Sequence, residues 1–157
     1  DLALMQAARP PRLETEVFAY GRMPLAFSAR CFTARHLNLP KDDCRFSCLQ
    51  HPDGLLLKTR ENEDFLVLNG IQTQSARVYN LLDAVADMAS LGIDVLRISP
   101  QAAHTKEVVN AFAAARRGET VDPDCLSPLL PAASCNGYWH GQAGLDQCSV
   151  NAAAPTA

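Results

Sequence analysis

Three cysteines, Cys31, Cys44 and Cys48, fall within eighteen residues and restrict the fold of this chain more than any other feature of its sequence. Their spacing is C-x12-C-x3-C, which a long loop and one tight turn provide. Thiolates held in this way can share a soft metal centre. Iron–sulfur clusters and structural zinc sites normally have four ligands, so the segment predicts a metal site that needs one more ligand.

Disulfides and unrelated buried thiols are the alternatives for the six cysteines of the chain. Three disulfides would suit a secreted protein, but the first residues have no signal-peptide pattern. In addition, 48% hydrophobic residues are enough for a core without covalent staples. We therefore favour binding of a metal ion or cluster over both alternatives.

Charge and hydropathy argue against two further classes of protein. The formal net charge is −3, whereas nucleic-acid-binding domains usually present a basic face. No apolar run approaches the roughly 18 residues that a membrane-spanning helix needs. We expect a soluble, cytoplasmic protein with one domain, and a fragment of a longer one, because the chain starts without Met inside an apparent amphipathic helix.

The pattern of apolar residues predicts strands that alternate with helices around a long irregular segment. The expected elements are a helix at 2–9, a strand at 13–19, an irregular segment at 21–54, strands at 55–58 and 65–68, a helix capped by Ser75 and running from 78 to 91, a strand at 93–98 and a helix at 105–117. This order predicts the α/β class, as the carboxyl-terminal half of a TIM-like (β/α) barrel with a long cysteine-bearing loop. The barrel domain would occupy residues 1–150, with the loop at 21–54 and a disordered tail at 151–157.

Several motifs resemble the signature of the collagenase-like peptidase family. The stretch EVFAYG at Glu16–Gly21 is similar to E-V-F-x-H-G of that family. The run SARC that ends at Cys31 resembles S-G-R-C, and Cys44 and Cys48 match the two cysteines that follow. Near the end of the chain, CNGY from Cys135 extends the similarity, which is greatest to the branch of the family that takes part in ubiquinone biosynthesis.

The resemblance implies a TIM-like barrel in which Cys31, Cys44 and Cys48 bind a [4Fe-4S] cluster. It implies a role in the oxygen-independent, anaerobic hydroxylation of the ubiquinone ring, in a heterodimer with a UbiU-like sister subunit. Prephenate would be the oxygen donor, and a lipid-binding accessory protein would present the precursor. A collagenase-like or metal-dependent peptidase is the alternative, although no catalytic-triad order and no H-E-x-x-H helix is found in the sequence.

Pro24 stands where the wider family has its first cysteine, so the usual set of four cysteines is incomplete. By the same resemblance, we expect the fourth ligand to come from an amino-terminal half that these 157 residues lack. Cys135 is the other candidate for that position. Cys125 and Cys148 are expected to be incidental.

Two further sets of polar side chains are open to more than one interpretation. The first set would offset the charge of a cluster, bind an acidic molecule such as prephenate or simply form a solvated loop, and consists of Arg30, Arg35, Lys41 and Arg45. The second set consists of Asn69, Gln72 and Gln74, which follow a predicted strand. These side chains would either line a site at the end of a barrel or belong to an ordinary loop, and we prefer the loop.

Overall fold

The computed structural model describes residues 2–149, apart from the side chain of Lys41. The elements in chain order are α1 (Leu2–Ala8), β1 (Glu16–Gly21), β2 (Pro24–Phe27), α2 (Phe32–His36), η1 (Lys41–Asp43), η2 (Ser47–Gln50), β3 (Leu55–Lys58), β4 (Asp64–Asn69), β5 (Gln72–Ser75), β6 (Val78–Asn80), η3 (Leu82–Ala84), α3 (Val85–Ser90), β7 (Val95–Ile98), α4 (Thr105–Arg116), η4 (Pro123–Leu129) and β8 (Ser134–Cys135). The η segments are short 3-10 helices. The tail expected at 151–157 lies outside the described residues.

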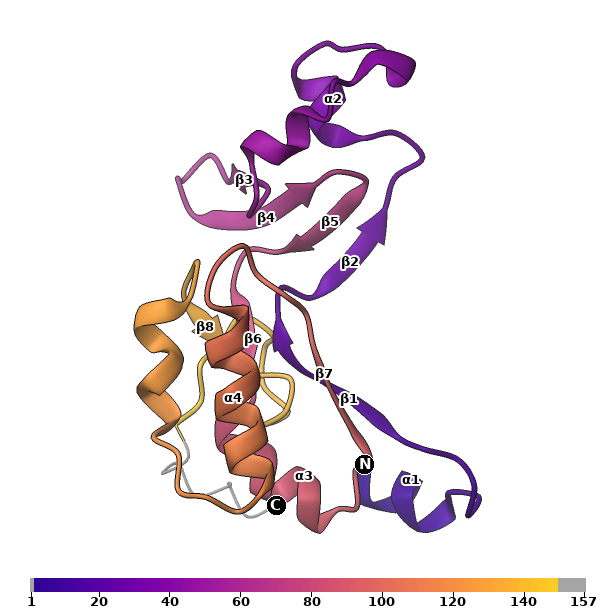
Figure 1. Ribbon diagram of the computed structural model, residues 1–157, viewed down its shortest axis with the longest axis vertical. Helices are drawn as coiled ribbons and strands as arrows, with labels where there is room; N and C mark the ends of the chain where they lie inside the picture. The colour runs from indigo at the N-terminus through magenta and orange to yellow at the C-terminus, as the bar shows by residue number, and fades with distance from the viewer. Residues whose placement is uncertain (1, 150–157) are drawn as a thin grey trace.

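A body and a smaller lobe share these elements between them (Figure 1). The body consists of α1, β1 and everything from β6 onward, and its sheet has the order β7-β1-β6-β8. In this sheet β1 is parallel to β7 and antiparallel to β6, while β6 is parallel to β8. The lobe spans residues 24–75, which we call the cysteine lobe, and its antiparallel sheet has the order β2-β5-β4-β3.

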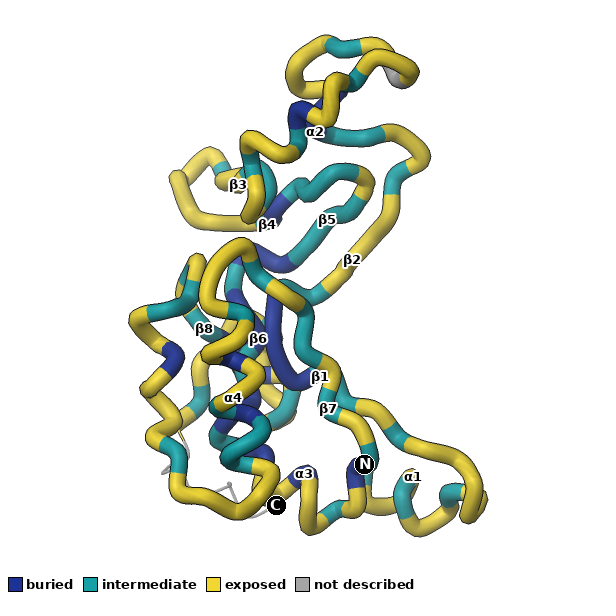
Figure 2. The backbone as a smooth tube through the Cα atoms, viewed as in Figure 1, coloured by how far each residue is buried: buried dark blue, intermediate teal, exposed yellow. Residues whose placement is uncertain are grey.

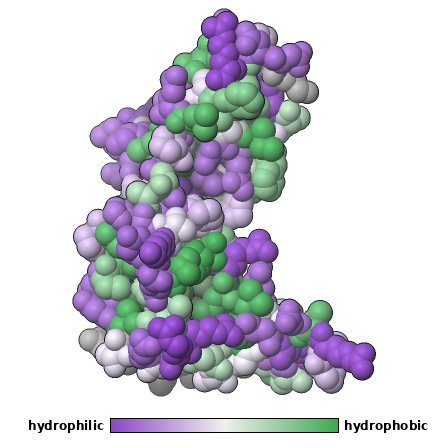
Figure 3. Space-filling view, viewed as in Figure 1, coloured by the Kyte–Doolittle hydropathy of each residue, from purple (hydrophilic) through white to green (hydrophobic). Residues whose placement is uncertain are grey.

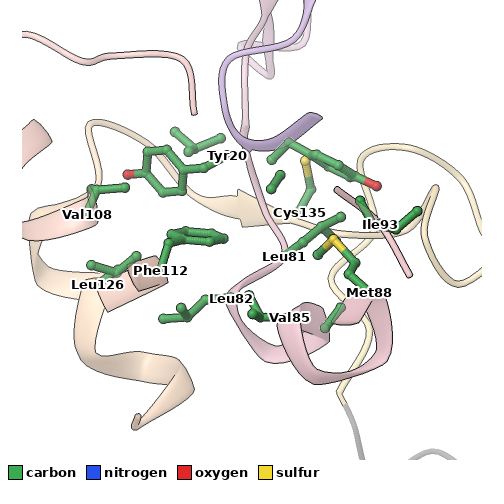
Figure 4. Close-up of a cluster of buried hydrophobic side chains, with 14 residues drawn as sticks. Tyr20, Leu81, Leu82, Val85, Met88, Ile93, Val108, Phe112, Leu126 and Cys135 are labelled. Atoms are coloured by element: carbon green, nitrogen blue, oxygen red, sulfur yellow. The ribbon is translucent and has the colours of Figure 1, made fainter. Parts of the chain in front are cut away.

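The hydrophobic core lies in the body, where α3, α4 and η4 pack on the sheet (Figure 4). Val108 and Phe112 are one helical turn apart on α4 and are both buried, which explains why this segment forms a helix against the sheet. The ring of Phe112 meets that of Tyr20 on β1 edge to face, with ring centroids 5.8 Å apart. The helix ends at Arg116, and Gly118, just beyond the C-cap Arg117, has a φ of +80° that suits a residue without a side chain.

The cysteine lobe is less buried than the body, as the tube in Figure 2 shows. Its hairpin between β3 and β4 is closed by Thr59, whose backbone N–H donates to the carbonyl of Glu63 at 2.9 Å. The hydroxyl of Thr59 also accepts from the N–H groups of Glu61 and Glu63. Val67 in the middle of β4 is buried, whereas every residue of the edge strand β2 is exposed.

Ser75 joins the lobe to the body at the point where two chain segments pass between them. Its N–H donates to the carbonyl of Met23 at 3.0 Å, and its hydroxyl accepts from the N–H of Met23 at 2.9 Å. The same hydroxyl donates to the carbonyl of Arg77 at 2.7 Å. The guanidinium of Arg22 donates to the carbonyls of Ser75 and Ala76. We call this set of hydrogen bonds the joint.

The structure confirms the mixed α/β class, the pair of strands at 55–58 and 65–68 and the helix that starts at Thr105. No closed barrel is seen among the described residues, and a half-barrel stays a prediction. No helix in the described part of the chain is long and apolar enough to cross a membrane.

Two of the expected elements were wrong in part; the helix expected at 78–91, for example, is helical only at η3 and α3. Residues 75–80 form the end of β5 and the strand β6 instead of a helix, because Val78 and Tyr79 are both buried between β1 and β8 and the two-residue periodicity of a strand is therefore hidden. Within the segment expected to be irregular at 21–54, the chain forms β2 and α2.

Asp94 fastens α1 and the start of β1 to the body. One carboxylate oxygen of Asp94 accepts from the N–H of Thr15 at 2.8 Å and from its hydroxyl at 3.1 Å, and it forms an ion pair with Arg9. The N–H of Thr15 and, after it, the side chains of Arg9 and Thr15 hold the pKa of Asp94 below its usual value. The side chain of Gln6 adds hydrogen bonds to the carbonyls of Leu91 and Gly92.

Replacing Asp94 with asparagine should flatten the dependence of stability on acid pH. The pKa of Asp94 is lower in the folded chain than its unfolded value of about 3.9, so the carboxylate stabilises the fold fully above that pH and loses this effect as pH falls through the lowered pKa. Urea unfolding between about pH 6 and pH 2 measures the slope. Asp87→Asn, at an exposed position on α3, should keep the wild-type slope; equal slopes for wild type and Asp94→Asn would contradict this role.

Candidate functional site

Cys31, Cys44 and Cys48 lie at or next to α2, η1 and η2. In Figure 1, α2 lies in the part of the cysteine lobe that is farthest from the body. Cys31 immediately precedes α2, and its carbonyl accepts from the N–H of Arg35 at 3.1 Å. Cys44 follows η1, and Cys48 lies within η2. All three are free thiols and half-buried. The structure therefore brings the predicted ligands to one region of one lobe.

The segments that carry these cysteines differ in how firmly they are held. The N–H of Phe32 at the start of α2 donates to the carbonyl of Gly70 at 2.7 Å, which ties Cys31 to the lobe sheet. By contrast, Ser47 is the one buried side chain among those described at 37–50. Arg45 and Phe46, between the other two cysteines, have φ values of +53° and +49°, which bulky residues rarely adopt.

The described geometry does not itself form a metal site. Among residues 2–149, no group of three or more His, Cys, Asp or Glu side chains is close enough to hold a metal ion. The donor chemistry suits iron and sulfide, but the three sulfurs do not converge. To bind a cluster, residues 37–50 would have to change conformation, and the small buried surface of this segment keeps the free-energy cost of such a change low.

Cys135 lies apart from these three cysteines, in the core of the body (Figure 4). It is 2% exposed on β8, where it pairs with Tyr79. Burial raises the pKa of the Cys135 thiol, and the positive charge of Arg77 opposes this only in part. A structural thiol is the interpretation that fits this position. Cys125 is exposed on η4, and the backbone of Cys148 is held by the side chain of Asn136.

Alkylation by a maleimide should separate these two groups of thiols. We expect Cys31, Cys44 and Cys48 to be labelled in native buffer while Cys135 stays unlabelled, because its sulfur is covered by the core and its pKa is raised. Peptide mass spectrometry after short reaction times gives the rates, and urea should abolish the difference. Native labelling of Cys135 at the rate of Cys31 would contradict the assignment.

A cleft of about 290 Å³ opens where the cysteine lobe meets the carboxyl ends of β1 and β7. In α/β folds, ligands commonly bind at the carboxyl ends of parallel strands. The polar residues that line the cleft come from both parts of the chain and are Arg22, Asp53, Asn69, Gln74, Ser99 and Gln101. Asn69 and Gln74, for which ordinary loop chemistry was preferred, therefore line a cleft, and the amide of Gln74 donates to Gln72 at 2.7 Å.

Arg22 brings a positive charge to this cleft. Its Nη1 is used by the joint, but its Nε is buried without a hydrogen-bond partner in the described structure. Burial lowers the pKa of Arg22, and the carboxylates of Asp53 and Asp64 act in the opposite direction. A guanidinium with an unsatisfied donor is suited to a carboxylate or another oxygen-rich anion.

Two further polar groups of the cleft, Asp53 and Gln101, are held in place by hydrogen bonds. Asp53 accepts from the N–H of Ala102 at 3.2 Å, which connects the lobe to the body across the cleft. Gln101 accepts from the hydroxyl of Tyr20 at 2.7 Å and donates to the carbonyl of Leu129 at 2.8 Å. Burial raises the pKa of Tyr20 to about 12, so this hydroxyl keeps its proton at neutral pH.

Gly21 allows β1 and β7 to approach each other closely at the floor of the cleft. A Cβ atom on Gly21 would lie 2.5 Å from the Cβ of Ser99, and its φ of +117° is one that other residues rarely adopt. The N–H of Ser99 donates to the carbonyl of Tyr20 at 2.8 Å and keeps the two strand ends together. A larger residue at position 21 would push them apart.

Sequence reasoning singled out the cysteine segment and named Asn69 and Gln74, although it preferred ordinary loop chemistry for them, and it missed Arg22, Asp53 and Gln101. Arg22 directly follows the EVFAYG motif, which is the one sequence cue to its position. Asp53 and Gln101 are far apart in sequence and meet only because the lobe folds over the ends of β1 and β7. No local pattern marks them.

Comparison with known proteins gives one family. The model of Peptidase family U32 matches residues 2–119, which is more than half of the chain and includes β1, the cysteine lobe, β7 and α4. No solved structure matches the chain.

Proposed function

This chain belongs to Peptidase family U32, and from that premise we propose that it is an iron–sulfur subunit of an oxygen-independent hydroxylase. Its sequence motifs are most similar to UbiV-like proteins, so we place this hydroxylation in anaerobic ubiquinone biosynthesis. The observation that carries the proposal is the set of free, half-buried thiols at Cys31, Cys44 and Cys48, which lie on one lobe and within the matched residues.

Several properties of the cysteine segment support cluster binding over the other uses of cysteine. The three thiols are unpaired, and none of them belongs to the hydrophobic core. Arg30 and Arg35 have no carboxylate partner among the described ion pairs, so their charges are available to offset a cluster with thiolate ligands. We propose that these three residues ligate a [4Fe-4S] cluster and that a donor other than Cys135 completes it.

Anaerobic reconstitution with iron and sulfide tests this proposal. With an excess of a small thiol to supply the fourth ligand, we expect the wild-type chain to acquire iron and the visible absorption of a thiolate-ligated cluster, and each of Cys31→Ala, Cys44→Ala and Cys48→Ala to lose most of both. Cys125→Ala is the matched control, because Cys125 is also exposed to solvent but lies on η4, and it should retain them. Failure of the wild type to take up iron, or an equal loss in the control, would refute the assignment.

We further propose that the cleft receives the acidic oxygen donor, prephenate. The support is the partly unsatisfied guanidinium of Arg22, together with the amide side chains of Asn69 and Gln74, which line the same cleft. Arginine binds carboxylates through paired, charge-assisted hydrogen bonds, and the amides add neutral donors. The bound molecule would lie at the carboxyl ends of β1 and β7.

Binding of prephenate by calorimetry should depend on these side chains. Gln74→Ala removes one amide donor and should weaken binding about three- to tenfold, as expected for a single hydrogen bond of roughly 1 kcal/mol. Arg22→Lys should weaken it by more than about tenfold, since a lysine cannot form the paired contact. Because Arg22 also belongs to the joint, its variant is compared with Arg60→Gln, a change at an exposed position in the β3–β4 turn. Unchanged affinity in both cleft variants would exclude this cleft as the site.

The proposed partners are a UbiU-like sister subunit, in a heterodimer, and a lipid-binding accessory protein. The cysteine lobe supports an association of this kind, because its edge strands β2 and β3 have an unpaired side and carry exposed apolar residues. Hydrophobic surface is visible on both the body and the cysteine lobe, including the hollow between the lobe and the part of the body that carries α1 (Figure 3).

Peptide hydrolysis is the second candidate, and the description of the family favours it. Ser99 is the hydroxyl that lines the cleft, but no histidine is found among the described residues that line it with Ser99. A serine nucleophile needs an adjacent base, so this geometry gives the peptidase less support. Cleavage of a peptide library that persists after removal of iron would favour hydrolysis over the iron–sulfur proposal.

A further inference from the structure

We propose that the free end of the cysteine lobe docks on a lipid bilayer that carries anionic headgroups. This end, which we call the tip, consists of residues 37–50 and is the part of the molecule farthest from α1 and α3 (Figure 1). Most of it is exposed (Figure 2). The proposal goes beyond the proposed hydroxylase function; it concerns residues 37–50 in their described conformation and is tested on the chain before any reconstitution with iron.

Large apolar side chains project from the tip into solvent. Phe46 is 73% exposed and Leu49 is 79% exposed, and Leu37 at the start of the same segment is 41% exposed. The N–H of Leu49 donates to the carbonyl of Phe46 at 2.9 Å, which closes a turn with both apolar side chains on it. An aromatic and an aliphatic side chain on one exposed turn are typical of protein segments that insert at the boundary between headgroups and acyl chains.

The backbone conformation that exposes Phe46 is unfavourable in free energy. Phe46 and its neighbour Arg45 both have positive φ values, which are unfavourable for bulky residues. Neither side chain is buried against the lobe, so intramolecular packing does not offset the unfavourable backbone. An external surface that covers Phe46 would offset it.

The charge of the tip region complements an anionic surface. Within the tip, Lys41 and Arg45 balance Asp42 and Asp43. The excess charge comes from the adjoining Arg30 and Arg35, so that residues 27–51 carry +2, whereas the rest of the chain, whose total is −3, carries −5. Asp43 forms an ion pair with Arg45 at 3.2 Å. Arg30 and Arg35 have no such partner among the described carboxylates and are exposed. The molecule would therefore approach an anionic bilayer with this end first.

The same features fit a lipid surface better than a nucleic acid. Single-stranded nucleic acids bind to several aromatic rings on which bases stack, and Phe46 is the one ring at the tip. Leu37 and Leu49 cannot stack on or hydrogen-bond to a base, whereas their transfer from water to acyl chains is favourable in free energy. Because few side chains take part, the binding should be weak and sensitive to salt.

Co-sedimentation with vesicles tests the proposal on the whole chain. We expect binding to vesicles of phosphatidylcholine and phosphatidylglycerol, little binding to phosphatidylcholine alone, and loss of binding at high salt. The double variant Phe46→Ser, Leu49→Ser should abolish binding. Arg30→Gln with Arg35→Gln should weaken it about 25-fold, roughly fivefold for each charge removed.

Matched controls at the other end of the molecule make the test specific. Leu4 and Met5 on α1 are 69% and 67% exposed, so Leu4→Ser with Met5→Ser removes similar apolar surface and should leave vesicle binding unchanged. Arg12→Gln with Lys106→Gln removes two exposed cations of the body and should have a much smaller effect than Arg30→Gln with Arg35→Gln. Far-UV circular dichroism confirms that each variant is folded.

Three results would overturn the proposal. They are no binding to anionic vesicles, equal binding by the Phe46→Ser, Leu49→Ser variant, and equal losses in the α1 control. Tight binding of single-stranded RNA that depends on Arg30 and Arg35, without vesicle binding, would identify the tip as a nucleic-acid surface instead.

Discussion

The hydrogen bonds around Ser75 determine where the two parts of this molecule lie relative to each other. The chain leaves the body after β1 and returns before β6, and both passages meet at this residue. Ser75 and Arg22 satisfy backbone groups of Met23, Ser75, Ala76 and Arg77 that would otherwise be buried without partners. Since each unsatisfied buried group costs about 1–3 kcal/mol, other orientations of the lobe are disfavoured.

The cleft is a consequence of that orientation. Its walls come from the end of β1, the loop after β7 and the parts of the lobe that carry Asp53, Asn69 and Gln74. Arg22 belongs to both the joint and the cleft, so the residue that fixes the lobe also supplies the positive charge there. A change that weakens the joint would therefore alter the shape and the electrostatics of the cleft together.

How much of this could be predicted from the sequence depends on how local each feature is. The helix at Thr105–Arg116 was predictable because Val108 and Phe112 mark one face of it, and the β3–β4 hairpin because a charged turn separates two apolar runs. β6 was mistaken for helix because both of its faces are buried. The cleft depends on which strand ends lie next to each other in space, and no local sequence pattern indicates that arrangement.

The arrangement of the three cysteine sulfurs could not be predicted from their spacing either. Sequence spacing identified three candidate ligands, but their distances depend on residues 37–50, where little surface is buried and two bulky residues have unfavourable backbone angles. A segment like this gains most of its order from what binds to it, because few internal contacts oppose a change of conformation. The anchored start of α2 and the rigid joint would then serve as the fixed side of such a site, while the tip adapts to a metal centre or a surface. The body, with its large core, would thus provide the stable part of the molecule, while the lobe carries the candidate cysteine ligands.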